Sequence, residues 1–319
     1  MYRIGIDLGG TNIAAGIVNS DFKIIAKASV PTVVNEGAER VAKDIAGICD
    51  KITKDNGITM DEIESIGIAS PGIANSEEGV VEYSCNLPFR KFHICETLSS
   101  LTGVASIHVE NDANAAAWGE AVAGAAKGTK NSVMITLGTG VGGGIIIDGK
   151  VYSGFNFAGA ELGHTVIEKD GRPCNCGRKG CWEAYSSATG LINLTKEKIE
   201  ECGKSGRPTL MNDFVAKHGK VNGMTAFAAM RDGDMAGKEV VDEYIAYLAC
   251  GLANIVNIFQ PEVVSIGGGV SNEGQLLIDL LMPYIKSETY GGEFVKPTDI
   301  RIAKLGNDAG IVGAATLGM

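Results

Sequence analysis

Two stretches of this sequence repeat one pattern: a strand rich in isoleucine and valine, a glycine turn and a second such strand. Residues 4–18 read IGIDLGGTNIAAGIV and residues 133–147 read VMITLGTGVGGGIII. The two can be laid on each other with Leu8-Gly9 over Leu137-Gly138. Apolar, β-branched runs on both sides of a glycine turn are typical of paired antiparallel strands. A chain that contains this pattern twice is expected to form two similar α/β domains that face each other across a cleft.

The length of the chain also favours two domains. At 319 residues it exceeds what one hydrophobic core normally covers. We expect an N-terminal α/β domain made of residues 1–118 and 306–319, and a C-terminal α/β domain made of residues 119–305. Hydrophobic periodicity predicts the main helices and strands. Helices are expected at 36–56, 237–259 and 275–287, and strands at 23–30, 63–69, 105–110, 262–266 and 299–303.

Both glycine turns are predicted to bind phosphate. Residues 138–143, GTGVGG, match the dinucleotide-binding pattern G-x-G-x-x-G, which requires a helix directly after the turn. The strand residues Ile145-Ile146-Ile147 follow instead, so that interpretation is rejected. What remains at both positions is a turn between two strands, whose N–H groups can form a nest for phosphate oxygens. Ordinary hairpin turns are the alternative for either loop alone, and the occurrence of both favours phosphate binding.

Asp112 stands where a predicted strand gives way to a predicted helix, within ENDAN at residues 110–114. Side chains at such a junction point into the space beside the carboxyl edge of a sheet. Asp112 is therefore a candidate general base that accepts a proton from a substrate hydroxyl. Capping of the helix by Asn111 or Asp112 is the structural alternative, and capping and catalysis can coexist.

The stretch from Glu161 to Glu183, ELGHTVIEKDGRPCNCGRKGCWE, gathers four soft metal ligands. This set predicts a tetrahedral zinc site of Cys₃His type. Four protein ligands leave no open position for an activated water, so the zinc is expected to be structural. The ring nitrogen of His164 that does not bind zinc could still donate a hydrogen bond. The predicted ligands are His164, Cys174, Cys176 and Cys181, and the remaining cysteines, at 49, 85, 95, 202 and 250, are expected to bind no metal.

The charge of the chain limits its partners. Lys and Arg number 28 against 38 Asp and Glu, which gives a formal net charge of −10 and argues against nucleic-acid or anionic-membrane binding. An anionic ligand would need local capture by backbone amides or a metal ion, and Asp7 could bind Mg²⁺ through water. Asp7 also interrupts the opening apolar run, so no signal peptide is expected. The apolar run at 245–259 is too short to cross a membrane, and a cytoplasmic protein is predicted.

Together these motifs resemble those of the ROK sugar kinases, a family similar in fold to actin and hexokinase. The resemblance covers essentially the whole chain and implies two ribonuclease-H-like domains around a cleft. The most specific motif is ELGH at 161–164 followed by C-x-C-G-x-x-G-C-x-E at 174–183. The others are DLGGT at 7–11, SPG at 70–72, ENDAN at 110–114, LGTGVGGG at 137–144 and IGGGVS at 266–271.

The resemblance also implies a role for individual residues. Asp112 would be the catalytic base. The residues expected to bind the sugar are Gly72, Asn86, Asn111, Asp112, Glu161, His164 and Glu183. Those expected near ATP or its metal ion are Asp7, Gly9, Gly10, Thr11, Gly138, Thr139, Gly140, Gly267 and Gly268. One departure is Phe89, which stands where many members carry Trp, at a position expected to border the sugar pocket.

The activity implied is ATP-dependent, Mg²⁺-requiring transfer of a phosphoryl group to the 6-hydroxyl of glucose, a step of glycolysis. A homodimer is expected. Two alternatives stay open. One is the same chemistry on another sugar, such as fructose, allose or N-acetylmannosamine. The other is a sugar-sensing regulator without turnover, which the intact Asp112 and the start of the first strand at residue 2, without a helix-turn-helix before it, disfavour.

Overall fold

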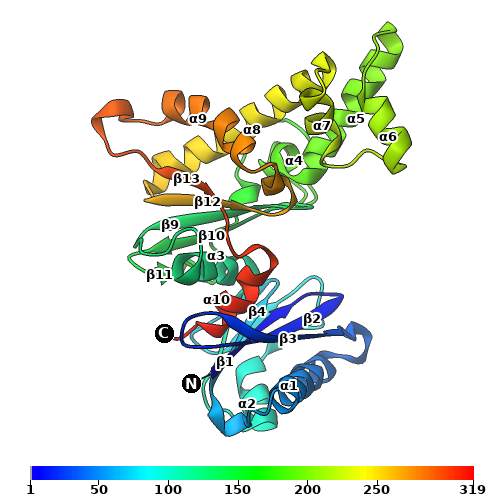
Figure 1. Ribbon diagram of the computed structural model, residues 1–319. Coiled ribbons are helices and arrows are strands. Elements are labelled where there is room, and N and C mark those ends of the chain that lie inside the picture. The colour runs from blue at the N-terminus through cyan, green and yellow to red at the C-terminus, as the bar shows by residue number, and fades with distance from the viewer. Residues whose placement is uncertain (1) are drawn as a thin grey trace. The chain divides into compact units, whose positions relative to one another are not determined.

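The computed structural model describes residues 2–319, and its first sheet contains the N-terminal glycine turn (Figure 1). Its strands are β1 (Tyr2–Leu8), β2 (Asn12–Val18), β3 (Ile24–Pro31), β4 (Ile63–Ser70) and β8 (Ile107–Asn111). They lie in the order β3-β2-β1-β4-β8. β1, β2 and β3 pair antiparallel, whereas β1, β4 and β8 run parallel. The antiparallel pair predicted on either side of the glycine turn is therefore confirmed.

Helices cover both faces of this sheet (Figure 1). They are α1 (Ala38–Asp55), α2 (Ile94–Thr102), α3 (Asp112–Ala123) and α10 (Ala309–Ala315). Side chains alternate along a strand, so Ile4 and Ile6 of β1 enter the core that includes residues of α1 and α2. Gly5 points to the other face, where a Cβ would lie 1.9 Å from the carbonyl oxygen of Ile311 in α10. Glycine at this position therefore lets α10 lie directly on the sheet.

A small antiparallel sheet follows the SPG turn. Its strands are β5 (Ile73–Asn75), β6 (Val80–Tyr83) and β7 (Arg90–Phe92), in the order β5-β6-β7. This sheet was not predicted, because strands of three or four residues are too short to show a hydrophobic period. The segment between β6 and β7 contains Cys85 and Asn86, so the sheet places a residue expected to bind sugar.

The second large sheet contains the second glycine turn. Its strands are β9 (Ser132–Leu137), β10 (Val141–Ile147), β11 (Lys150–Val151), β12 (Val263–Gly267) and β13 (Asp299–Ile302), in the order β11-β10-β9-β12-β13. β12 and β13 run parallel, and β10 and β11 form the hairpin at Asp148-Gly149. The later helices are α4 (Glu183–Ser186), α5 (Ala188–Ser205), α6 (Met211–His218), α7 (Thr225–Arg231), α8 (Met235–Phe259) and α9 (Gln275–Glu288). Of these, α8 and α9 were predicted, whereas α6 and α7 were not.

The chain forms two compact units. One comprises Met1–Met134, Gly143–Ala160 and Ala303–Met319, and the other comprises Ile135–Gly142 and Glu161–Ile302. The domain boundaries expected from the sequence, 1–118 with 306–319 and 119–305, stay a prediction. Within residues 2–319, no helix combines the length and the apolar character that crossing a membrane would require.

Candidate active site

Asp112 is the first residue of α3, directly after β8. The cap of this helix is Asn111, whose Oδ1 accepts hydrogen bonds from the backbone amides of Ala113 at 2.9 Å and Asn114 at 3.2 Å. Oδ1 of Asp112 accepts a further bond from the amide of Ala113, also at 2.9 Å. The side chain of Asp112 is exposed to solvent. Capping is thus carried mainly by Asn111, and Asp112 stays accessible to a substrate hydroxyl.

Two carboxylates, those of Asp7 and Asp112, lie near the ends of elements in the unit that contains the first sheet. Asp7 is the last but one residue of the strand β1, and burial raises its pKa to about 6, with a smaller contribution from the negative charge of Asp112. The pKa of Asp112 is also raised, because surrounding protein reduces its solvation, although hydrogen bonds from Ala113 and Asn111 oppose the shift. Raised carboxyl pKa values bring a group closer to the strength that a general base needs near neutral pH.

The SPG turn is tied to the same cap residue. Nδ2 of Asn111 donates to the carbonyl oxygen of Gly72 at 3.0 Å. Gly72 has φ of 103°, and a Cβ there would lie 2.1 Å from the carbonyl oxygen of Tyr83. Gly72 is therefore required by the turn itself, and its carbonyl group helps to orient Asn111.

Asn86 and Phe89 differ in their exposure to solvent. The side chain of Asn86 is exposed, and its Cβ is 3.3 Å from a Cβ built on Gly10 of the first glycine turn. Phe89 is completely buried and stacks on Phe92 with ring centroids 5.2 Å apart. The ring of Phe89 belongs to the hydrophobic core, and its place at the border of the sugar pocket stays a prediction.

The first glycine turn presents backbone amides without protein acceptors. The amide of Gly9 donates to the carbonyl oxygen of Asn12, and Thr32 binds the carbonyl oxygens of Gly9 and Thr11 through its hydroxyl and its amide. Among residues 2–319, the amides of Gly10 and Thr11 have no hydrogen-bond acceptor. A turn held by its carbonyl groups with its N–H groups free matches the nest that binds anions.

The second glycine turn is held by Glu183. Oε2 of Glu183 accepts the amide of Val141 at 3.0 Å, and a Cβ on Gly140 would lie 2.2 Å from that oxygen. The beginning of α5 adds two hydrogen bonds. The amide of Ala188 donates to the carbonyl oxygen of Gly138, and the hydroxyl of Thr189 donates to the carbonyl oxygen of Thr139. Glu183, which was expected only as a sugar ligand, thus also fixes this turn.

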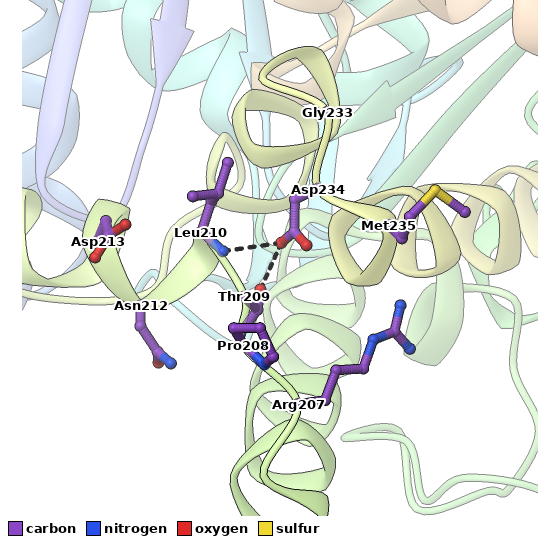
Figure 2. A pocket seen from close by; sticks show the side chains of 9 residues that line it. All are labelled: Arg207, Pro208, Thr209, Leu210, Asn212, Asp213, Gly233, Asp234 and Met235. Carbon is purple, nitrogen blue, oxygen red and sulfur yellow. Dashed lines mark hydrogen bonds between the residues drawn. The ribbon is translucent and has the colours of Figure 1, made fainter.

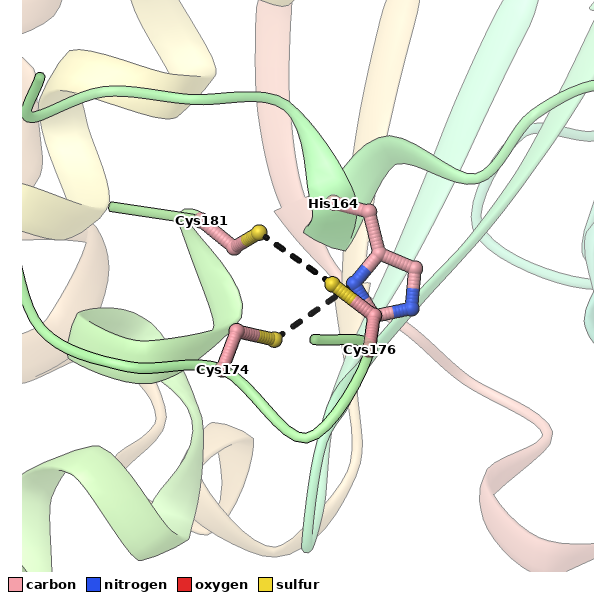
Figure 3. Close-up of side chains that lie close together, drawn as sticks. All are labelled: His164, Cys174, Cys176 and Cys181. Carbon is pink, nitrogen blue, oxygen red and sulfur yellow. Dashed lines mark hydrogen bonds between the residues drawn. The ribbon is translucent and has the colours of Figure 1, made fainter. Parts of the chain in front are cut away.

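The four predicted metal ligands lie together, which Figure 3 shows. Their ligand atoms all fall within 4.8 Å of one another. Sγ of Cys174 is 3.8 Å from Nδ1 of His164, and Sγ of Cys176 is 3.6 Å from Sγ of Cys181. Ligand atoms of a tetrahedral zinc site with Zn–S bonds of about 2.3 Å lie about 3.8 Å apart. The donor set and its spacing therefore fit structural zinc.

The ring of His164 is oriented in the way that the zinc interpretation requires. Nδ1 faces the sulfur atoms (Figure 3). Nε2 lies 4.0 Å from Oε2 of Glu161. The guanidinium of Arg178 donates to the carbonyl oxygen of His164 at 3.2 Å. Since Nδ1 would be the metal ligand, Nε2 would carry the proton and could donate it to a hydroxyl.

The stretch from Glu161 to Glu183, called the metal stretch from here on, is anchored in the hydrophobic core by Trp182. This side chain is completely buried, and its Nε1 donates to the carbonyl oxygen of Tyr247 in α8 at 3.1 Å. A Cβ on Gly251 would lie 2.0 Å from the indole, so the glycine of α8 makes room for it. The residues on either side of Trp182 are a metal ligand, Cys181, and Glu183, so one anchor fixes both.

Gly268 directly follows β12 and lies against Leu137, the residue before the second glycine turn. Its φ is 82°, and a Cβ would lie 2.6 Å from the backbone of Leu137 at the end of β9. Only glycine fits at this position, because the two backbone segments lie too close together for a side chain. Gly267 and Gly268 keep their expected role near the nucleotide as a prediction.

A hollow of about 610 Å³ lies elsewhere, between the α5–α6 and α7–α8 connections (Figure 2). None of its nine lining residues was expected to bind substrate or nucleotide. Two of its charged groups have partners: Arg207 forms two bonds with Glu239, and Asp234 accepts from Thr209 and from the amide of Leu210. We assign it no ligand.

The sequence interpretation gave no role to Glu110. This residue is the last but one of β8 and is 4% exposed, and its carboxylate accepts three hydrogen bonds. The available signal was an acidic residue inside the predicted strand at 105–110.

Comparison with known proteins gives one consistent result. The sequence pattern of the ROK family matches residues 3–319. A glucokinase of Halalkalibacterium halodurans is 36% identical over 322 residues, which cover 99% of this chain and 94% of that protein. A glucokinase of Streptomyces coelicolor is 35% identical over 314 residues, with 98% and 96% covered. A crystal structure of a ROK family glucokinase from Streptomyces griseus, in complex with glucose and AMPPNP, is 33% identical with a TM-score of 0.78 and 99% of both chains covered.

Proposed function

Because this chain belongs to the ROK family, we propose that it is an ATP-dependent kinase that phosphorylates glucose to glucose 6-phosphate. The predicted two-domain α/β fold of the actin and hexokinase type is confirmed by its structural relatives. The choice of glucose is supported by two relatives named glucokinase at 35–36% identity over nearly the whole chain. ATP as phosphoryl donor is supported by the Streptomyces griseus enzyme, which binds AMPPNP beside glucose.

The observation that supports this function best is the geometry around Asp112. The residue lies at the beginning of a helix that its neighbour Asn111 caps, its side chain is accessible, and its pKa is raised. In the proposed reaction, the carboxylate of Asp112 takes the proton of the sugar 6-hydroxyl as that oxygen attacks the γ-phosphorus. The bond from this phosphorus to the β,γ-bridging oxygen breaks, and ADP leaves. The proton ends on Asp112 and then passes to water.

The two glycine turns are proposed to bind the phosphates of ATP. The first offers the free amides of Gly10 and Thr11, and the second includes Gly138, Thr139 and Gly140. Asp7 would hold Mg²⁺ through water. Mg²⁺ would supply neutralisation of the charge that develops on the phosphates.

The sugar hydroxyls are proposed to bind side chains of three kinds. Asn86 and Asn111 supply amides, and Glu161 and Glu183 supply carboxylates. Nε2 of His164 supplies a donor whose tautomer zinc would fix through Nδ1. A homodimer and a cytoplasmic location also remain predictions.

A coupled assay of ADP release with a panel of sugars tests the substrate directly. Glucose should give the highest kcat/KM, ahead of fructose, allose, N-acetylglucosamine and N-acetylmannosamine, and release should require ATP and Mg²⁺. Turnover of N-acetylmannosamine without turnover of glucose would reject the glucose assignment. Glucose binding in calorimetry without any ADP release would instead indicate a sugar sensor.

A further inference from the structure

Glu110 is a buried carboxylate that the proposed mechanism does not use. Its Oε1 accepts the backbone amide of Asn111 at 2.8 Å and Nδ2 of Asn114 at 3.1 Å. Its Oε2 accepts the hydroxyl of Ser153 at 3.1 Å. Burial raises the pKa of Glu110, and these three hydrogen bonds act in the opposite direction. Acidic side chains are rarely buried to this degree unless they are paired, so the partners indicate what the residue does.

One group of partners belongs to the turn that carries the proposed base. Asn111, whose amide Glu110 holds, directly precedes Asp112 and caps α3 with its own side chain. Asn114 is the third residue of α3, and Glu110 binds its side-chain amide. Glu110 therefore holds the backbone directly before Asp112 and a side chain of the helical turn directly after it. A displaced backbone here would move the carboxylate of Asp112 away from the position that proton transfer requires, and errors of about 1 Å can lower a rate about a hundredfold.

The third partner lies far away in the sequence. Ser153 begins a closed loop, because its carbonyl oxygen accepts the amide of Gly159 at 2.8 Å. Phe157 in this loop and Ala160 directly after it have φ of 60° and 65°, a left-handed conformation that residues with a side chain rarely adopt. Such backbone strain persists only where surrounding contacts hold it in place. The bond from Ser153 to Glu110 is one such contact, and it fastens the neck of the loop to the turn at Asp112.

We propose that Glu110 is a positioning residue for the reaction: it holds the Asp112 turn and the neck of the 153–159 loop in one fixed arrangement through Asn111, Asn114 and Ser153. This inference rests on the proposed role of Asp112 as base. The residue needs acceptors of the right geometry rather than a negative charge. Glutamine can supply them, because its Oε1 can accept from Asn111 and Asn114 while its Nε2 donates to the hydroxyl of Ser153.

Steady-state kinetics of Glu110→Gln, Glu110→Ala and Ser153→Ala test the proposal on the full-length protein. Glu110→Gln should keep kcat within about threefold of wild type, whereas Glu110→Ala should lose about tenfold or more, since the base is no longer held in place. KM for ATP should change less than about twofold, because no partner of Glu110 belongs to a glycine turn. Ser153→Ala should lower kcat about three- to tenfold, and adding it to Glu110→Ala should cause no further loss, because the bond is already broken.

The matched control is Ser106→Ala, which removes a serine of the same unit that pairs with Nε2 of His108 at 3.0 Å. It should leave kcat unchanged. All rates are taken well below the melting temperature of each variant, so that a loss of folded protein is not counted as a loss of kcat. If Glu110→Ala does not fold, Ser153→Ala decides: a lower kcat at an unchanged melting temperature supports the proposal, and an unchanged kcat overturns it.

The inference is also overturned if folded Glu110→Ala keeps wild-type kcat, or if the losses of Glu110→Ala and Ser153→Ala multiply. Asp112→Asn separates this failure from failure of the proposed function. Full turnover in Asp112→Asn would remove the base that Glu110 is supposed to position. Loss of turnover there together with normal kcat in Glu110→Ala would reject only the role of Glu110.

Discussion

At the scale of single residues, the site depends on how each carboxylate is solvated. Asp7 is partly buried, and the charge of Asp112 adds to the rise of its pKa. The pKa of Asp112 is also raised, because surrounding protein reduces its solvation, but hydrogen bonds from Ala113 and Asn111 favour its ionised form. Asp7 suits a site that a cation completes, and Asp112, which is accessible at the beginning of α3, suits proton transfer.

Asp7→Asn is expected to raise the melting temperature at about pH 8 in the absence of nucleotide and Mg²⁺. The pKa of Asp7 is raised from 3.8 to about 6 in the folded protein, so the wild type loses stability as the pH rises through this range. Asparagine removes that loss. The advantage of the variant should shrink as the pH falls toward about 4, where both residues are neutral in the folded state. Equal melting temperatures at about pH 8 would show that burial of Asp7 is not unfavourable.

Gly140→Ala is expected to destabilise the second glycine turn, whereas Gly138→Ala is not. A Cβ at Gly140 would push the carboxylate of Glu183 away from the amide of Val141, and a hydrogen bond to a charged group contributes about 1.5–3 kcal/mol. A Cβ at Gly138 would meet nothing within 4 Å. Thermal melts of the two variants without ligand make the comparison. Identical melting temperatures would mean that Glu183 does not hold the turn.

At the scale of elements, the sequence predicted what carries a strong local signal. The long helices α1, α8 and α9 show helical periodicity, and the hairpin β1–β2 has a glycine turn between apolar strands. The sheet β5-β6-β7 and the helices α6 and α7 lacked such signals, because their elements are short. How these elements pair and pack depends on contacts with distant segments.

The candidate site was predictable to the same extent. The spacing of the four metal ligands predicted that they lie together, and the predicted strand–helix junction placed Asp112 at the beginning of a helix. Contacts between distant residues were not predictable. The bond from Glu183 to Val141, the bond from Ser153 to Glu110 and the burial of Phe89 all depend on the folded backbone.

Loss of the metal should affect the whole metal stretch. Cys176→Ser is expected to lower zinc content, melting temperature and glucose affinity together, because the ligands also fix His164 and Glu183. Cys85→Ser, which removes an exposed thiol outside the cluster, should change neither zinc content nor melting temperature. Metal analysis, thermal melts and glucose titration give the three readouts. A Cys176→Ser protein that has lost zinc but keeps both stability and affinity would contradict a structural role of the metal.

At the scale of the whole molecule, the match to the ROK family covers residues 3–319, so all the motifs of the resemblance lie within it. The free amides of the first glycine turn, the Cys₃His cluster and the capped helix at Asp112 occur in one chain whose likeness to glucokinases extends over nearly its full length. A regulator without turnover would not require an accessible base at the beginning of α3. The central claim is therefore chemical: Asp112 removes the proton of the sugar hydroxyl.

The most direct measurement is the rate of glucose 6-phosphate formation by wild type and by Asp112→Asn at saturating glucose and ATP, with calorimetric titration of glucose into both. The variant should bind glucose and lose about 10²- to 10⁴-fold in kcat, the usual contribution of a general base. Asp61→Asn, a change at an exposed aspartate of the same unit, should keep the wild-type rate. If Asp112→Asn forms glucose 6-phosphate within a few fold of the wild-type rate, Asp112 is not the base.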